Sequence, residues 1–247
     1  MNAVALRAHV ESVLAKRCPA PFAPLRPKLT EKIPTGFAEI DQLTAGGVPQ
    51  GELSEVCGPA SSGRTSLQLA LMAEVTSRGD LCALVDVNDN FSPDFAAQAG
   101  VDLESLLWVR CGGKNSPGEL RRVEQGMKAV DLLLESGGFT LVIFDLADAS
   151  PQAARRIPLA SWFRFRKTVE HKSTAFVVME NEPHARSCAA LVLSLNRSGE
   201  QWSKLGSEEY PSGTLLREVS CSAEIARGKP VSRIPMANFE LASRWAV

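Results

Sequence analysis

The sequence contains no long apolar run, no excess of charge of either sign and no closely spaced cysteine pair. Its longest apolar stretches, such as residues 141–144 and 176–179, are far shorter than the roughly 18 residues that a membrane-spanning helix needs. The N-terminal segment lacks the long apolar region and small-residue cleavage site of a secretory signal. We therefore expect a cytoplasmic protein.

The charges of the whole chain nearly cancel, because the chain has 27 Lys and Arg residues and 28 Asp and Glu residues. A net charge of −1 excludes a polycation that coats nucleic acid by charge alone, so any DNA binding requires a local basic patch. The cysteines form no CxxC pair and several lie in apolar runs, which favours buried, reduced thiols over a metal or redox site. They are Cys18, Cys57, Cys82, Cys111, Cys188 and Cys221.

The chain of 247 residues, 45% of them hydrophobic, has the composition of an ordinary globular domain. We expect an N-terminal helix and Pro-rich basic arm at residues 1–34, one domain at 35–235 and a C-terminal tail at 236–247. Five prolines between residues 18 and 34 exclude a helix there. Because six basic residues of the arm oppose two acidic ones, it is either a solvated segment or a contact for a neighbouring subunit or an acidic partner.

Short apolar runs alternate with helical patterns beyond residue 33. This alternation, with nearly continuous apolar strands, predicts an α/β fold with a mostly parallel, twisted sheet flanked by helices. Two later segments, 215–225 and one ending near Phe239, have polar interruptions that predict antiparallel edge strands. The core strands are predicted at residues 53–57, 81–87, 106–110, 140–145, 174–180 and 189–195, and the helices at 65–77, 93–98, 117–135 and 159–171.

A glycine-rich loop follows the predicted strand 53–57 and precedes a predicted helix. In that context GxxxxGK[ST] forms a phosphate cradle, because the glycines let successive N–H groups point at an anion. Arg64 stands where the motif has a lysine, and its planar guanidinium group is bulkier than a lysine ammonium group. Thr65 offers a hydroxyl group to Mg²⁺. The candidate phosphate-binding residues are Gly58, Pro59, Ser61, Ser62, Gly63, Arg64, Thr65 and Ser66.

Asp145 closes the apolar run 141–144. An acidic residue at the end of such a strand can hold the ligand shell of a Mg²⁺ ion at a phosphate site. Asp148 is the competing candidate, although it lies beyond the run, and a simple strand cap is the structural alternative for Asp145.

Together these motifs resemble the core of the bacterial RecA recombinase family. The resemblance implies a RecA-like P-loop fold, with ATP and Mg²⁺ as cofactors and single-stranded DNA as a ligand. It also implies that Thr35 and Asp41 are structural. It is carried by Ile33-Pro34-Thr35-Gly36, Asp41, Gly46-Gly47-Val48-Pro49-Gln50-Gly51, Glu55, the loop from Gly58 to Ser66, Ala83-Leu84-Val85-Asp86 and Gly100-Val101-Asp102.

The sequence differs from the family pattern at the positions that would carry out ATP hydrolysis. Asn88 stands where the family has a glutamate that activates water, and an amide cannot accept the proton. Asp89 is the possible substitute. Glu180 and Glu182 lie where the family senses the γ-phosphate, and two carboxylates there would repel a triphosphate. We expect nucleotide binding that is weak or lost, with little ATP hydrolysis.

The two DNA-binding loops of the family correspond here to residues 146–173, mostly a predicted helix, and to the short connection 182–188, so strand exchange is not expected. Basic and aromatic residues interleave between 155 and 172. They form a nucleic-acid platform, a protein-partner surface or the basic outer side of an ordinary amphipathic helix. The candidate DNA or partner contacts are Arg155, Arg156, Trp162, Arg164, Arg166 and Lys167.

By resemblance, Arg227 and Lys229 are candidates for reaching the nucleotide of a neighbouring subunit. His9, His171 and His184 are too scattered for a metal site or a catalytic triad, and we expect them at the surface.

Within the RecA-like proteins, the altered phosphate loop, the short DNA loops and the Pro-rich arm are similar to the ImuA family of SOS-mutagenesis accessory proteins. This resemblance implies a protein of the DNA damage response and translesion synthesis that contacts a RecA filament or an ImuB-like, polymerase-related partner. The alternative is an active ATP-dependent recombinase or DNA-stimulated ATPase, with Asp89 as the base. A small-molecule kinase is a weaker alternative, because no acceptor-site motif is visible.

Overall fold

The computed structural model describes residues 31–112, 118–206, 211–228 and 236–242. The chain divides into two compact units, Met1–Thr30 and Glu31–Val247, and the fold described below is that of the second. The expected N-terminal helix, most of the Pro-rich arm, Cys18, His9 and Lys229 lie outside the described residues.

One eight-stranded sheet forms the centre of this unit, in the order β10-β9-β8-β3-β7-β6-β4-β5. Its parallel part comprises β3 (Leu53–Cys57), β4 (Cys82–Asp86), β5 (Leu106–Arg110), β6 (Leu141–Asp145) and β7 (Ala175–Glu180), together with the start of β8 (Leu191–Gly206). β8, β9 (Pro211–Arg227) and β10 (Met236–Ala242) pair antiparallel to one another. The predicted α/β fold with antiparallel strands near the C-terminus is confirmed.

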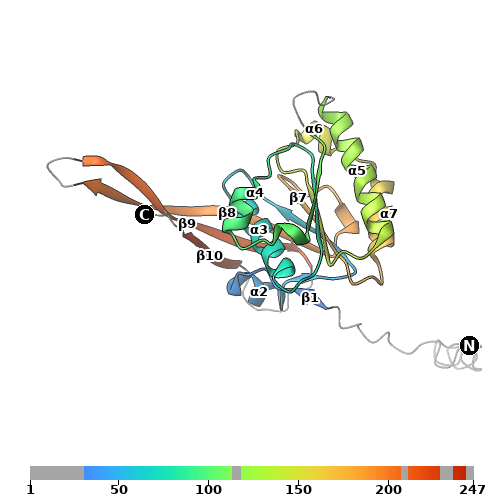
Figure 1. Ribbon diagram of the computed structural model, residues 1–247, viewed down its shortest axis with the longest axis horizontal. Helices are drawn as coiled ribbons and strands as arrows, with labels where there is room; N and C mark the ends of the chain where they lie inside the picture. The colour runs from blue at the N-terminus through green and yellow to red at the C-terminus, as the bar shows by residue number, and fades with distance from the viewer. Residues whose placement is uncertain (1–30, 113–117, 207–210, 229–235, 243–247) are drawn as a thin grey trace, which may run out of the picture. The chain divides into compact units, whose positions relative to one another are not determined.

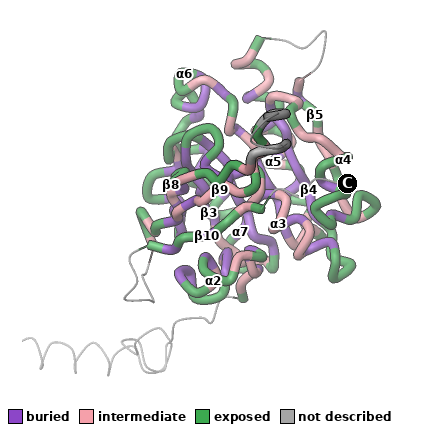
Figure 2. Tube along the Cα trace, turned by 90° about the vertical axis from the view of Figure 1, so that its left-hand side faces the viewer, coloured by how far each residue is buried: buried purple, intermediate pink, exposed green. Residues whose placement is uncertain are grey.

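Helices cover both faces of the sheet because its central strands are apolar on both sides. Val142 and Phe144 of β6 pack into a core cluster with α5 (Glu119–Ser136) and α7 (Leu159–Val169). Leu141 and Ile143 alternate with them and pack on the other face, with α2 (Ala38–Thr44), α3 (Arg64–Thr76) and α4 (Pro93–Gln98). Figure 1 shows the two groups of helices on opposite sides of the sheet, and Figure 2 shows buried backbone in the interior with exposed backbone around it.

The segment before α2 belongs to the fold and not to the arm. β1 (Lys32–Ile33) pairs antiparallel with β2 (Val48–Pro49), and Ile33 is 2% exposed. Asp41 accepts hydrogen bonds from both the backbone N and the Oγ1 of Thr35, each at 2.8 Å. The compact unit therefore begins at Glu31, earlier than the boundary expected after residue 34, and β10 makes the expected tail an edge strand of the same sheet.

Helix α5 lies unusually close to the sheet. A Cβ atom at Gly126 would meet the Phe144 ring at 2.8 Å, so only glycine permits this approach. The helix begins at Glu119 after Gly118, while Pro117, the expected first residue, lies outside the described residues. The Glu119 carboxylate accepts hydrogen bonds from the backbone N and the Oγ of Ser150, both at 2.6 Å, and so joins α5 to the segment after β6.

The segment between β6 and β7 contains α7 and the short helix α6 (Pro151–Ala154), and the segment between β7 and β8 contains the 3-10 turn η2 (Arg186–Cys188). A second 3-10 turn, η1 (Leu103–Ser105), precedes β5. In the part of the chain described by the structure, no helix is both long and apolar enough to cross a membrane.

The pairing of β8 with β9 extends well past the sheet body. We expected a strand only over residues 189–195, whereas β8 runs to Gly206 and pairs with β9 in a long antiparallel hairpin that projects from the sheet in Figure 1. Trp202 on this hairpin is 55% exposed. Because both faces of the projecting part meet water, its sequence lacks the apolar alternation that marks a half-buried strand.

The described cysteines are free and buried, as predicted. Burial raises the pKa of Cys111 to about 11 and raises that of Cys82 still further. Neither thiol is a ready nucleophile or metal ligand near neutral pH, because the reactive form is the thiolate.

Candidate functional site

The candidate residues gather at one edge of the sheet because the strands that precede them are parallel. Cys57 at the end of β3 is in register with Glu180 at the end of β7, and Asp86 of β4 is in register with Asp145 of β6. The glycine-rich loop after β3, Asp145 at the end of β6 and Asn88 after β4 therefore lie at the same carboxyl edge of the parallel sheet, with β7 between β3 and β6. Ligands bind at this edge in open α/β sheets.

The backbone of the loop has the shape of a phosphate cradle. Gly58 donates its N–H to the Glu180 carbonyl oxygen at 3.2 Å, and a Cβ atom at Gly58 would lie 2.3 Å from the Leu195 carbonyl oxygen. Gly63 has φ of 93° and is the N-cap of α3, where no side chain caps the helix. The first amides of α3 thus remain available for an anion, which the positive end of the helix favours.

The side chains of the loop divide into exposed and buried sets. Pro59, Ser61 and Thr65 are exposed and Ser66 is half-buried, so the Thr65 hydroxyl is accessible as a Mg²⁺ ligand. Ser62 is 1% exposed, and its Oγ has no hydrogen-bond partner among the described residues.

Arg64 folds from the loop towards the end of β6. Its side chain is buried, with 8% of the residue exposed, and Nη1 donates to the Ala147 carbonyl oxygen at 3.4 Å. The guanidinium group therefore lies between the phosphate loop and the segment that follows Asp145. A lysine has no planar fork for this contact, so the substitution changes where the positive charge is held.

Asp145 is the acidic residue that ends β6 at this edge of the sheet. Burial raises its pKa to about 6, and the charges of Asp86 and Asp148 add to the increase. One of its oxygens accepts the Ala147 N–H at 2.9 Å, which leaves the other for a ligand. Asp148, the competing candidate, is exposed and accepts a hydrogen bond from the Asn90 side chain at 2.8 Å.

These residues fit a bound phosphate group with a Mg²⁺ ion held by Thr65 and Asp145. Among the described residues no group of three or more His, Cys, Asp or Glu side chains is placed to hold a metal ion unaided. A Mg²⁺ ion at this site would therefore need phosphate oxygens and water to complete its ligands.

The loop after β4 is built on the Asp86 carboxylate. Asp86 is 2% exposed and accepts hydrogen bonds from the backbone N of Asn88 at 3.2 Å and of Asp89 at 2.7 Å. Asn88, at the position expected for a water-activating glutamate, accepts a hydrogen bond through Oδ1 from Arg122 at 3.3 Å. The side chain there is an amide already engaged by a cation.

Asp89 is poorly suited to replace that glutamate. Both of its carboxylate oxygens accept hydrogen bonds from Arg110, at 2.6 and 2.8 Å. These hydrogen bonds to Arg110 lower the pKa of Asp89. A carboxylate paired in this way is a weaker proton acceptor.

The structure shows a buried acidic cluster that the sequence analysis did not recognise. Glu55 Oε1 accepts hydrogen bonds from the backbone N of His184 at 2.7 Å and of Ala185 at 2.5 Å. Glu180 is 1% exposed, and its Oε2 lies 2.7 Å from His184 Nδ1. Burial, followed by the neighbouring Glu180, raises the pKa of Glu55 to about 8, and burial raises that of Glu180 to about 7.

His184 is therefore not the surface residue that we expected, since only 13% of its side chain is exposed. Burial lowers its pKa. The signal that could have revealed the cluster is the acidic residue in each of two fully buried strands, β3 and β7. His171 is exposed as expected, with 78% of its side chain accessible.

The basic segment forms the outer side of an amphipathic helix. Trp162 is 1% exposed and packs edge-on to Phe165, so its ring is not available for base stacking. The tertiary core uses this face of α7, which argues against base stacking on Trp162, whereas a partner contact at Trp162 stays a prediction. Arg164 is bound to both carboxylate oxygens of Asp131, at 2.8 and 2.6 Å, and Arg166 donates to the Ser187 carbonyl oxygen at 3.5 Å.

The remaining basic candidates are exposed. Lys167 lies on the outer side of α7, Arg155 and Arg156 lie between α6 and α7, and Arg227 ends β9. Arg227 lies beside Val192 at the start of β8. Its predicted role towards a neighbouring nucleotide stays a prediction.

Comparison with known proteins identifies relatives over the first part of the domain. The family model described as the RecA N-terminal domain matches residues 24–155. Protein RecA of Brucella anthropi is 37% identical over 125 residues, which cover 50% of this chain and 32% of that protein. Protein RecA of Prochlorococcus marinus strain MIT 9211 is 39% identical over 124 residues, covering 50% and 31%, and that of Cutibacterium acnes is 34% identical over 123 residues, covering 49% and 33%. The chain thus spans about a third of the length of these curated relatives.

Proposed function

The chain belongs to the RecA N-terminal domain family, and from that premise we propose that it is an accessory protein of the DNA damage response in which ATP hydrolysis is weak or lost. It acts in translesion synthesis in the manner of the ImuA family. Its main contacts are with proteins, a RecA filament or an ImuB-like partner, and single-stranded DNA is a secondary ligand.

The observation that carries this proposal is the state of the residues that should prepare water for attack. Asn88 offers an amide, and the neighbouring carboxylate, Asp89, is neutralised by Arg110. Loss of a positioned general base typically reduces a rate by about 10²- to 10⁴-fold. Arg64 adds to this loss, because its guanidinium is held by the Ala147 carbonyl group and not centred on the loop.

Nucleotide binding is retained in this proposal as a weak property. The amides at the start of α3 and the Thr65 hydroxyl would bind the phosphates and the Mg²⁺ ion, with Asp145 as a second ligand. The bound ion would supply neutralisation of the phosphate charge.

The connections at the same edge of the sheet support a protein-binding role over strand exchange. Residues 146–174 are largely occupied by α6 and α7, and only residues 181–190 separate β7 from β8. A filament-forming recombinase must wrap DNA with mobile loops, and the described connections leave little chain for that task.

Phosphate release from the purified full chain, with and without single-stranded DNA, tests the proposal. We expect turnover near background, and a measurable increase when Asn88→Glu and Arg64→Lys are combined. Asp145→Ala in the combined variant should abolish the gained turnover. DNA-stimulated turnover by the unaltered chain that Asp145→Ala or Arg64→Ala removes would show instead that it is an active ATPase.

The active ATPase remains the second candidate because the cradle is intact. Gly58 and Gly63 allow the close backbone approach and the positive φ that a phosphate-binding loop requires. Under that alternative Asp89 must accept the proton, so Arg110→Ala, which frees this carboxylate, should increase turnover, whereas the accessory proposal expects no change from background.

A further inference from the structure

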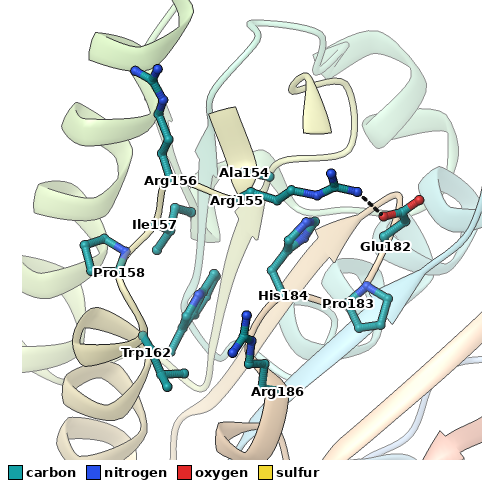
Figure 3. A pocket seen from close by; sticks show the side chains of 11 residues that line it. Ala154, Arg155, Arg156, Ile157, Pro158, Trp162, Glu182, Pro183, His184 and Arg186 are labelled. Atoms are coloured by element: carbon teal, nitrogen blue, oxygen red, sulfur yellow. Dashed lines mark hydrogen bonds and ion pairs between the residues drawn. The ribbon is translucent and has the colours of Figure 1, made fainter. Parts of the chain in front are cut away.

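A cavity of about 630 Å³ lies between two segments that follow neighbouring strands, β6 and β7. One segment joins α6 to α7 and carries Arg155 and Arg156, and the other follows β7 and carries Glu182 and Arg186. Figure 3 shows Arg186 and the His184 ring directed into the space between the segments, and Arg155 extending towards Glu182. We call this cavity the arginine pocket. Its volume is typical of sites that enclose a ligand.

The arginine pocket carries unbalanced positive charge. Arg155 is paired with Glu182 at 3.2 Å, but both side chains are more than 60% exposed, at 64% and 62%. An ion pair this exposed contributes little to stability, so a ligand carboxylate can replace Glu182 at little cost. Within the described part of the chain, neither Arg156 nor Arg186 is paired with a carboxylate.

Apolar groups line the same space. Ile157 and Trp162 are nearly fully buried, at 6% and 1% exposed, while Leu159 on the rim is 39% exposed. Pro158 and Pro183 complete the lining. A ligand that matches this surface must therefore present negative charge beside an apolar side chain.

We propose that the arginine pocket is a docking site for an acidic peptide segment of a partner protein. Its carboxylates bind Arg155, in place of Glu182, and Arg186, and one aliphatic side chain packs on Pro158 and Leu159. Arginine suits this role because its planar fork binds a carboxylate through two hydrogen bonds. Single-stranded DNA matches the pocket less well, since bases require an exposed aromatic face and Trp162 is buried.

The inference rests on the proposed function only in assuming a protein partner, and it can be tested separately. Short fluorescein-labelled peptides rich in Asp, each with a single Leu, are titrated with the full chain and followed by fluorescence anisotropy. Matched peptides carry Asn for Asp or Ala for Leu. We expect the Asp and Leu peptide to bind, and each matched change to weaken binding about tenfold or more.

Arg186→Ala and Arg155→Ala should each weaken binding about tenfold, whereas Arg186→Lys should retain part of it. Arg78→Ala is the matched control, because Arg78 is an exposed arginine paired with Glu74 on α3, outside the pocket. These exposed substitutions leave the core unchanged, and thermal denaturation of each variant checks this.

Three outcomes overturn the proposal: equal binding of the Asp and Asn peptides, equal weakening by Arg78→Ala, or binding of oligo-dT instead of the peptides that is lost in Arg186→Ala. The last outcome would assign the pocket to nucleic acid. Phosphate release is measured separately on the same preparation. If the chain hydrolyses ATP and also binds the acidic peptide, the accessory role is contradicted but the proposed peptide-binding pocket is not.

Discussion

Glu55 makes the stability of the fold depend on pH. Burial and the neighbouring Glu180 raise its pKa from 4.5 to about 8. Between these pH values the folded chain keeps a proton that the unfolded chain has released, so the free energy of unfolding falls as the pH rises. Each pH unit is worth about 1.4 kcal/mol, which sets an upper limit of about 5 kcal/mol for this group.

Glu55→Gln tests this reasoning because glutamine keeps an oxygen for the backbone N–H groups of His184 and Ala185 but cannot ionise. Near pH 5 the parent carries its proton, so the variant and the parent should unfold at similar urea concentrations. Above about pH 8 the variant should be more stable by at least about 1 kcal/mol, since it has no buried charge to accommodate.

Urea denaturation over a series of buffers from about pH 5 to about pH 8.5 measures the difference. Glu39→Gln is the control, because Glu39 is exposed on α2, and its curve should follow that of the parent. If the curves for the parent and Glu55→Gln remain parallel across the whole range, the buried carboxyl group does not retain its proton and the reasoning is refuted.

Three further outcomes are expected. Trp162→Ala should lower the free energy of unfolding by about 3–5 kcal/mol, while Phe163→Ala, at a 47% exposed position, should cost less than about 1 kcal/mol; equal effects in denaturant titrations would contradict the assigned helix face. Gly58→Ala should destabilise by about 1 kcal/mol or more, because the new methyl group meets a backbone oxygen, whereas Gly118→Ala, with open space around it, should melt within a few degrees of the parent. Removal of residues 1–30, which form a separate unit, should leave the circular dichroism spectrum of the core unchanged but weaken capture by immobilised RecA filaments; unimpaired capture would exclude the arm as the contact.

The central strands were predictable because they are buried on both faces and read as short apolar runs. β3 and β5 match their expected limits, and β4, β6 and β7 differ by a residue at one end or both. The projecting half of β8 was not predictable in the same way, since its residues pair with β9 without entering the core. Strands that are held only by backbone hydrogen bonds do not need alternating hydrophobic residues, so the sequence pattern does not reveal them.

The candidate site was predictable where one segment supplies it and not where distant segments meet. The loop from Gly58 to Ser66 follows from its motif, and Asp145 follows from its place at a strand end. The contact of Glu55 with His184 joins residues 129 positions apart. The acidic residue in each of two buried strands marks Glu55 and Glu180 as unusual, but it does not indicate that His184 is their partner. Arg64 was recognised as an exception, but its contact with Ala147 depends on how β3 and β6 are placed by the sheet.

The buried thiols give the protein an internal reporter of opening. Cys82 begins β4, between β5 and β6, with 0% exposure, and burial raises the pKa of its thiol far above neutral pH. A thiol-specific alkylating reagent can reach it only when β4 separates from its neighbours, so the labelling rate of Cys82, followed by peptide mass spectrometry, records how often the sheet opens. No introduced probe is needed for that measurement.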